Sequence, residues 1–120
     1  IIKANIKKYQ KNNITFKTID FIKDQLPPAD LIFSRDCLVH LNDDEILSCI
    51  NNVKKSKSKY FASTIFIKDY SNKESNLSDN WRPINLLEHP FNLPEPIKIL
   101  NDSTDFQNFK KIAIWDISGI

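Results

Sequence analysis

The segment DLIFSRDCLVHL, residues 30–41, constrains the fold more than any other part of the chain. Its residues 31–33 are continuously apolar, which is typical of a strand buried on both faces of a parallel sheet. Ser34, Arg35 and Asp36 follow at once, where that strand would leave the core. Because ligands of open α/β sheets bind outside the carboxyl ends of the strands, this polar triplet predicts a functional site.

Apolar periodicity in the rest of the chain predicts two helices and five strands. The helices are expected over residues 1–11 and from Asn42, which forms a capping box with Glu45, to the lysine-rich run 54–59. The strands are expected over residues 14–19, 30–34, 60–67, 97–100 and 112–117, the last two as an antiparallel hairpin. Helices and strands alternate in the first half, which is typical of an α/β protein with a mainly parallel sheet.

The segment 71–96 between the third and fourth of these strands has no helix or strand pattern. Residues 71–80 are polar and loop-like, and residues 81–96 carry four prolines among aromatic side chains. We therefore expect an irregular but packed excursion from the sheet.

Composition restricts the class of protein. The 120 residues suffice for one domain, and a net charge of +2 gives no support to general polyanion binding. The lysines of residues 54–59 are expected to form a solvated face rather than a nucleic-acid site. The sequence shows neither a membrane-spanning run nor a leader, so we expect a cytoplasmic protein that does not contact membranes. Cys37 and Cys49 are interpreted as buried free thiols, and no metal site is expected.

Two compositional details bear on function. Only Arg35 and Arg82 among the 17 basic residues are arginines, which suggests that these two positions require a planar guanidinium fork. The single glycine, Gly119, leaves no glycine-rich loop to approach a phosphate or nucleotide. Since the helical pattern already includes the first residue, Ile1, we expect a piece of a larger protein.

Four segments, ITFKTIDF, DLIFSRDCLVHL, KYFASTIF and WRPINL with the later PFNLP, together resemble a known family. The chain resembles the C-terminal half to two-thirds of a class I S-adenosylmethionine-dependent methyltransferase. That resemblance implies a Rossmann-like fold with strand order 3-2-1-4-5-7-6, in which strand 7 is antiparallel. Residues 14–19 would be strand 3, residues 31–33 strand 4 and residues 60–66 strand 5, and the closing hairpin would be strands 6 and 7.

The resemblance covers residues 1–120 as a partial methyltransferase domain that lacks the first two strands and their glycine-rich cofactor loop. We therefore expect this chain alone to bind S-adenosylmethionine weakly or not at all and to be inactive. Strand 3 would lack its usual partner, and an exposed strand edge favours association. We expect either a truncated chain or one completed by another copy.

The resemblance assigns Asp20, Phe21, Ser34 and Arg35 to the cofactor. Asp20 would accept the adenine amino group, and the backbone N–H of Phe21 would meet a ring nitrogen. Ser34 and Arg35 would line the methionine end. The alternatives are that Asp20 is a turn residue and that Arg35 and Asp36 form a local ion pair, which would contribute little net stability.

The acceptor side is assigned to Asp36, His40, Trp81 and Arg82. His40 has a pKa suited to removing a proton from an acceptor, although many methyl transfers need only positioning. Trp81 and Arg82 would cover the acceptor, with Arg82 suited to a carboxylate or phosphate. The alternatives are a packed structural histidine, an anchoring tryptophan, and an arginine that caps nearby carbonyl groups.

The sequence therefore predicts methyl transfer from S-adenosylmethionine to a small-molecule acceptor, at oxygen, nitrogen or carbon. One alternative is a degenerate or truncated methyltransferase-like module that serves only in interactions. Another is a different Rossmann-like enzyme, such as a nucleotide-dependent one.

Overall fold

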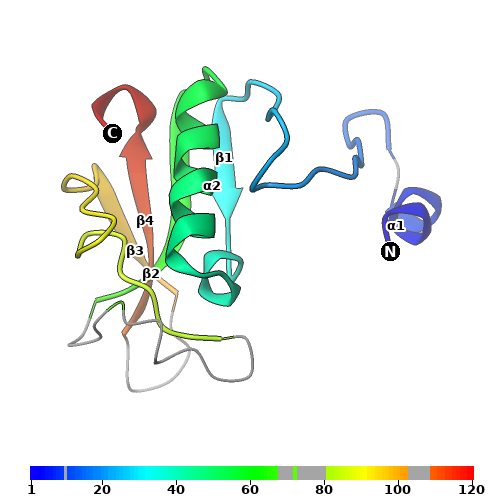
Figure 1. Cartoon of the computed structure of the whole chain (residues 1–120). Helices are drawn as coiled ribbons and strands as arrows, with labels where there is room; N and C mark the ends of the chain where they lie inside the picture. The colour runs from blue at the N-terminus through cyan, green and yellow to red at the C-terminus, as the bar shows by residue number, and fades with distance from the viewer. Residues whose placement is uncertain (10, 68–71, 73–80, 103–108) are drawn as a thin grey trace.

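The computed structural model describes residues 1–9, 11–67, 72, 81–102 and 109–120 (Figure 1). The helices are α1 (Ile2–Tyr9) and α2 (Asp43–Lys55), and short 3-10 turns span Leu38–His40 and Ile117–Gly119. The strands are β1 (Leu31–Ser34), β2 (Tyr60–Phe66), β3 (Lys98–Asn101) and β4 (Lys110–Asp116). All these elements except the 3-10 turns were expected, with bounds that differ by one or two residues.

The four strands form one mixed sheet in the order β1-β2-β4-β3. β1 and β2 are parallel, with Ser34 opposite Ser63, whereas β4 runs antiparallel to both β2 and β3. The carboxyl ends of β1, β2 and β3 therefore meet at one edge of the sheet, together with the start of β4. The α/β class is confirmed. The sheet is mixed: only the β1–β2 pair is parallel, but β1, β2 and β3 run in one direction and the C-terminal strand β4 alone is reversed.

The strand predicted over residues 14–19 does not form. Residues 15–19 have no regular structure, and Ile14 makes only an isolated bridge with Lys11 across the Asn12–Asn13 turn. Alternating side chains make a segment suitable for a strand, but its backbone N–H and C=O groups also need a neighbouring strand edge. The described sheet offers no pairing to this segment, so it remains an irregular connection between α1 and β1 (Figure 1).

Helix α2 begins and ends where the sequence predicts. The Asn42 side chain accepts from the Glu45 backbone N–H at 2.9 Å, and the Glu45 carboxylate accepts from the Asn42 N–H at 3.0 Å. Lys54 and Lys55 occupy the last turn, where they complement the partial negative charge of the helix end. Its buried face consists of Ile46, Cys49, Ile50 and Val53, which pack with sheet residues such as Phe61 and Trp115.

Burial of β1 on both faces, expected from its apolar run, is wrong. The exposed fractions of Leu31 and Phe33 are 48% and 58%, whereas Ile32 between them packs against the core. Because successive side chains of a strand point to opposite faces, α2 covers only the face that carries Ile32. Helix α1 has no buried residue and lies away from the sheet in Figure 1, so neither helix covers Leu31 and Phe33.

The excursion after β2 is irregular and packed, as predicted, for its described part. Ile84, Leu86, Phe91 and Leu93 are buried in the same core as α2. The indole N–H of Trp115 donates to the carbonyl of Pro94 at 2.7 Å, which attaches the segment to β4. Residues 71 and 73–80 of the predicted excursion lie outside the described residues.

Candidate functional site

Four charged side chains meet at the carboxyl edge of the sheet, and we call them the edge quartet: Arg35, Asp36, Asp102 and Lys110. Arg35 donates from Nε and Nη2 to the two carboxylate oxygens of Asp102, at 3.1 and 3.0 Å. Lys110 Nζ lies 2.7 Å from Asp36 Oδ1 and 3.6 Å from Asp102 Oδ2. Arg35 and Asp36 thus each pair with a partner from the β3–β4 end of the sheet.

The electrostatics of the edge quartet follow from these contacts. The hydrogen bonds from Arg35 are the main cause that lowers the pKa of Asp102 below its ordinary value, and Lys110 adds to this. The same pairing raises the pKa of Arg35. The Arg35 side chain is 55% exposed, so solvent weakens the pair and its contribution to stability is small. An exposed fork of this kind can exchange Asp102 for an anionic ligand.

The backbone at Asp36 has an uncommon conformation. Its φ is 54°, a left-handed value that aspartate adopts more readily than most residues. The Asp36 N–H donates to Thr64 Oγ1 at 2.9 Å, which fixes the end of β1 against β2. A held, positive φ at the end of a strand is one form of the local strain found at functional sites.

Ser34 has a buried hydroxyl group whose hydrogen-bonding capacity is unused among the described residues. Its side chain is 5% exposed, and Oγ has no hydrogen-bond partner among the described residues. Buried hydroxyl groups are nearly always hydrogen-bonded, because leaving one unsatisfied costs free energy. This hydroxyl could donate to or accept from a ligand held at the end of β1.

Asp20 and Phe21 are not brought to the edge quartet. Asp20 Oδ1 accepts from the Ile22 N–H at 2.9 Å, and the Asp20 N–H donates to Asp24 Oδ2 at 2.8 Å, so Asp20 forms a turn. Asn52 Nδ2 donates to the Phe21 carbonyl at 2.9 Å, three residues before α2 ends. The end of β1, by contrast, leads into the start of α2.

Phe21 borders an open apolar groove of about 320 Å³ beside β1. Ile19 and Leu26 line it from the connection that precedes β1, and Ile32 and Phe33 line it from β1 itself. Its described lining includes no charged side chain, so it suits an apolar group rather than an ionic one.

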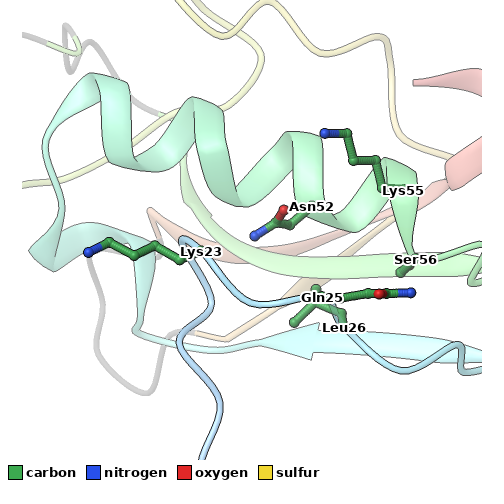
Figure 2. Close-up of a pocket in the computed structure, with 6 residues that line it drawn as sticks. All are labelled: Lys23, Gln25, Leu26, Asn52, Lys55 and Ser56. Carbon is green, nitrogen blue, oxygen red and sulfur yellow. The ribbon is translucent and has the colours of Figure 1, made fainter.

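A second hollow of about 350 Å³ lies between the irregular segment 23–26 and the end of α2 (Figure 2). Its lining residues are Lys23, Gln25, Leu26, Asn52, Lys55 and Ser56. The ammonium groups of Lys23 and Lys55 do not converge on a common point in Figure 2. None of the residues predicted for a site lines it.

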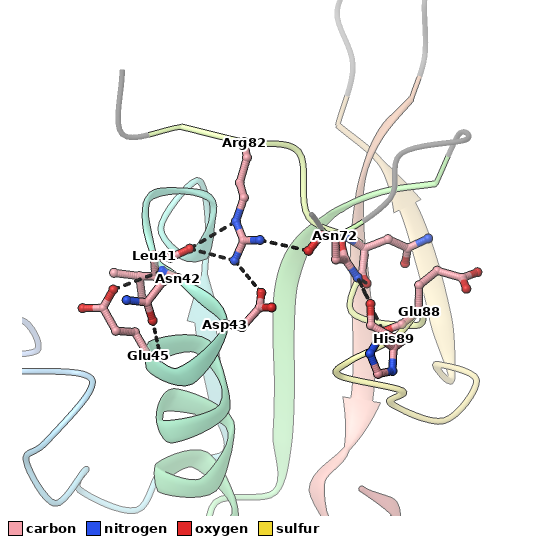
Figure 3. A network of polar contacts seen from close by, with 9 residues as sticks. Leu41, Asn42, Asp43, Glu45, Asn72, Arg82, Glu88 and His89 are labelled. Atoms are coloured by element: carbon pink, nitrogen blue, oxygen red, sulfur yellow. Dashed lines mark hydrogen bonds and ion pairs between the residues drawn. The ribbon is translucent and has the colours of Figure 1, made fainter. Parts of the chain in front are cut away.

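Arg82 lies in the interior with an exposed fraction of 0% (Figure 3). Its Nε and Nη2 donate to the Leu41 carbonyl at 3.3 and 3.0 Å, and Nη2 also donates to Asp43 Oδ1 at 2.7 Å. Its Nη1 donates to the Asn72 carbonyl at 3.0 Å. These contacts match the carbonyl-capping alternative, and they join the start of α2 to the segment that follows β2.

Asn72 continues this network into the excursion (Figure 3). Its side-chain amide donates to the carbonyls of Asn85 at 2.6 Å and His89 at 3.0 Å, and its Oδ1 accepts from the Asn85 N–H at 2.8 Å. This buried amide, together with the Trp115–Pro94 hydrogen bond, therefore holds the Pro-rich segment in place. His89 contributes its backbone carbonyl to this arrangement.

The remaining predicted residues lie toward solvent. His40 is exposed at the end of the Leu38–His40 turn, four residues after Asp36. Trp81 is 41% exposed and meets Phe66 edge to face, with ring centroids 5.6 Å apart, at the end of β2. This contact matches the anchoring alternative for Trp81 while leaving part of its ring accessible near the carboxyl edge.

Sequence reasoning missed Asp102, Lys110, Thr64 and Asn72. Asp102 follows β3 and Lys110 opens β4, so the predicted hairpin already placed both residues at its turn. What the sequence did not indicate is that these two side chains pair with Arg35 and Asp36 across the carboxyl edge. No sequence pattern marked Asn72 as a structural residue, since one asparagine in a polar segment is indistinguishable from its neighbours.

Comparisons with protein-family models, curated proteins and solved structures found no match. Within the described parts of the chain, no helix has the length and apolar character to cross a membrane. The same residues contain no group of three or more histidine, cysteine or acidic side chains placed to hold a metal ion.

Proposed function

We propose that this chain is the distal part of an enzyme that transfers a methyl group from S-adenosylmethionine to a small-molecule acceptor in the cytoplasm. The observation that carries the proposal is the strand order β1-β2-β4-β3 with β4 antiparallel to both its neighbours. The family resemblance implies this order for strands 4-5-7-6, with strand 7 as the reversed one. Residue patterns alone do not specify a crossover of this kind.

The chemistry of the carboxyl edge supports a ligand site there. The Ser34 hydroxyl is buried without a described partner, and Arg35 presents an exposed guanidinium to the same edge. We assign these two side chains to the methionine end of the cofactor, where S-adenosylmethionine supplies an electrophilic methyl group. Asp20 and Phe21 lie outside this site, because their turn packs near the end of α2 whereas β1 leads into its start.

We assign Asp36, His40 and Trp81 to the acceptor side, because all three expose side-chain surface around the carboxyl edge. Arg82 is assigned to positioning rather than to substrate contact, because its guanidinium already binds two carbonyls and Asp43. It holds the Leu38–His40 turn, and thus His40, against the segment that carries Trp81.

Calorimetry with S-adenosylhomocysteine tests the proposal. The titration compares the 120-residue chain with a longer polypeptide that includes the glycine-rich loop implied by the resemblance. Saturable binding is expected for the longer polypeptide, and Arg35→Gln should weaken it at least about tenfold if the fork binds an anionic group. Lys54→Gln, an exposed lysine on α2, is the matched control and should leave affinity unchanged.

Absence of binding by the longer polypeptide would overturn the enzyme proposal and favour an interaction module. Binding that Arg35→Gln leaves intact would remove Arg35 from the site without affecting the assigned activity. His40→Ala should lower turnover, measured as S-adenosylhomocysteine formation with oxygen, nitrogen and carbon acceptors, more than it lowers cofactor affinity. Equal turnover in the variant would remove His40 from the mechanism.

A further inference from the structure

The ion pair of the edge quartet between Arg35 and Asp102 joins an exposed side chain to a held one. The Asp102 N–H donates to the Lys110 carbonyl at 3.1 Å, and the Asp102 side chain is 17% exposed. The Arg35 side chain is 55% exposed, and within the described residues its guanidinium donates no hydrogen bond except the two to Asp102. Arg35 is therefore the partner that can move away.

Asp102 has a second cation within reach. Lys110 Nζ lies 3.6 Å from Asp102 Oδ2, while it pairs with Asp36 Oδ1 at 2.7 Å. An ammonium group carries three donors, so Lys110 can serve both carboxylates. Breaking an ion pair is costly mainly when it leaves one charge unpaired. Because Lys110 can take over Asp102, the departure of Arg35 leaves no such charge.

The geometry of the fork indicates which ligand group it accepts. Arg35 Nε and Nη2 bind the two oxygens of one planar carboxylate, at 3.1 and 3.0 Å. Ser34, the preceding residue, supplies an independent sign of a ligand at this end of β1. Its hydroxyl is buried without a described partner, whereas buried hydroxyl groups are nearly always hydrogen-bonded.

We propose that Asp102 is a built-in competitor for the ligand: a ligand carboxylate replaces Asp102 on the Arg35 fork, and Asp102 then pairs with Lys110. Asp102 thereby sets how tightly the site binds a carboxylate, because the ligand must displace a group that the chain itself holds in place. The inference rests on the proposed function only for the source of the carboxylate. That source is either the methionine end of the cofactor or an acidic acceptor.

Nitrogen-15 NMR of the 120-residue chain tests the exchange, with sodium acetate as the probe and sodium chloride at equal ionic strength as its control. Arg35 and Arg82 are the only arginines, so two side-chain Nε–H signals are expected. At about pH 6 Asp102 is ionised, because the hydrogen bonds from Arg35 lower its pKa. Acetate should shift the Arg35 signal and leave that of the buried Arg82 unchanged.

Variants of Asp102 test the competition directly. Asp102→Asn should raise the association constant for acetate at least about fivefold, because the competing carboxylate is gone. Asp102→Glu keeps a carboxylate and should raise it less. Asp30→Asn removes an equal charge from an exposed position at the other end of β1, and it should leave acetate binding unchanged. An Asp102→Asn chain that binds acetate no more tightly than the wild type would overturn the proposal.

Lys110→Gln separates the exchange from simple charge attraction. If Lys110 acts by receiving Asp102, its loss should weaken acetate binding in the wild type and have much less effect in the Asp102→Asn chain, where Asp102 no longer needs a second partner. Equal weakening in both backgrounds would mean that Lys110 attracts acetate directly, and would contradict the exchange.

The longer polypeptide identifies the source of the carboxylate. If the cofactor supplies it, Asp102→Asn should tighten the binding of S-adenosylhomocysteine but not of 5′-methylthioadenosine, which lacks the carboxylate. If an acidic acceptor supplies it, both affinities should stay unchanged while the acetate response of the short chain persists. A longer polypeptide that binds neither nucleoside refutes the proposed function, whereas the acetate titration decides the exchange independently.

Discussion

Replacing Arg82 tests whether one buried guanidinium holds the two halves of the candidate site together. In Arg82→Met the side chain keeps similar apolar bulk but loses its contacts with Leu41, Asp43 and Asn72. Each carbonyl left without a donor in the interior costs about 1–3 kcal/mol. The Asp43 carboxylate is 29% exposed and can regain water, so its share is discounted. We therefore expect a loss of about 3–5 kcal/mol in the free energy of unfolding.

Urea unfolding, followed by tryptophan fluorescence and circular dichroism, measures this loss. Arg82→Lys keeps the charge but not the fork, so its loss should be smaller than that of Arg82→Met. This second variant also keeps the test measurable if Arg82→Met is mostly unfolded, since small domains have only about 5–15 kcal/mol in total. Arg35→Met is the matched control, because the Arg35 guanidinium also donates two hydrogen bonds to one partner, at 3.1 and 3.0 Å, but does so on the surface.

The control should shift the unfolding midpoint only slightly, because exposed ion pairs contribute little to stability. If Arg82→Met and Arg35→Met shift the midpoint equally, burial of the Arg82 network does not stabilise the fold. The positioning role assigned to Arg82 would then be refuted as well.

Four further outcomes are expected. Asn42→Ala removes the helix cap and should cost about 1 kcal/mol in urea unfolding. Ser34→Ala removes a hydroxyl without a described partner, so it should change stability by less than about 0.5 kcal/mol while weakening S-adenosylhomocysteine binding in the longer polypeptide. Burial raises the pKa of Cys49 to about 12, so peptide mapping after alkylation should label exposed Cys37 in the native protein and Cys49 only after unfolding. Because the folded pKa of Asp102 is lowered, its stabilising effect is present above about pH 4 and lost below it, so the cost of Asp102→Asn in urea unfolding should shrink as the pH falls.

Local interactions in this chain were predictable from the sequence. The Asn42–Glu45 capping box forms as expected because its two residues lie within one helical turn and need nothing else. Strand β2 forms because an apolar, β-rich run is stable when it can be buried from both sides, which its central position allows. Each of these signals lies within a dozen residues of sequence.

Interactions between distant segments were not predictable. The ion pair of Arg35 with Asp102 joins residues 67 apart, and that of Asp36 with Lys110 joins residues 74 apart. Both pairs depend on the insertion of β4 between β2 and β3, which no residue pattern specifies. The strand over residues 14–19 failed for the same reason, since the pattern describes side chains whereas pairing depends on a neighbouring backbone.

The two arginines show how composition and structure complement each other. Sequence composition indicated that both positions need a guanidinium fork, and each one makes a forked contact, Arg35 with Asp102 and Arg82 with the Leu41 carbonyl. Burial then separates their roles. Arg82 is fully buried, so a change of partners would leave buried carbonyl groups without donors. Arg35 is 55% exposed and can leave Asp102, because Lys110 lies 3.6 Å from the Asp102 carboxylate and can balance its negative charge. Of the two, only Arg35 is therefore suited to recognise a ligand.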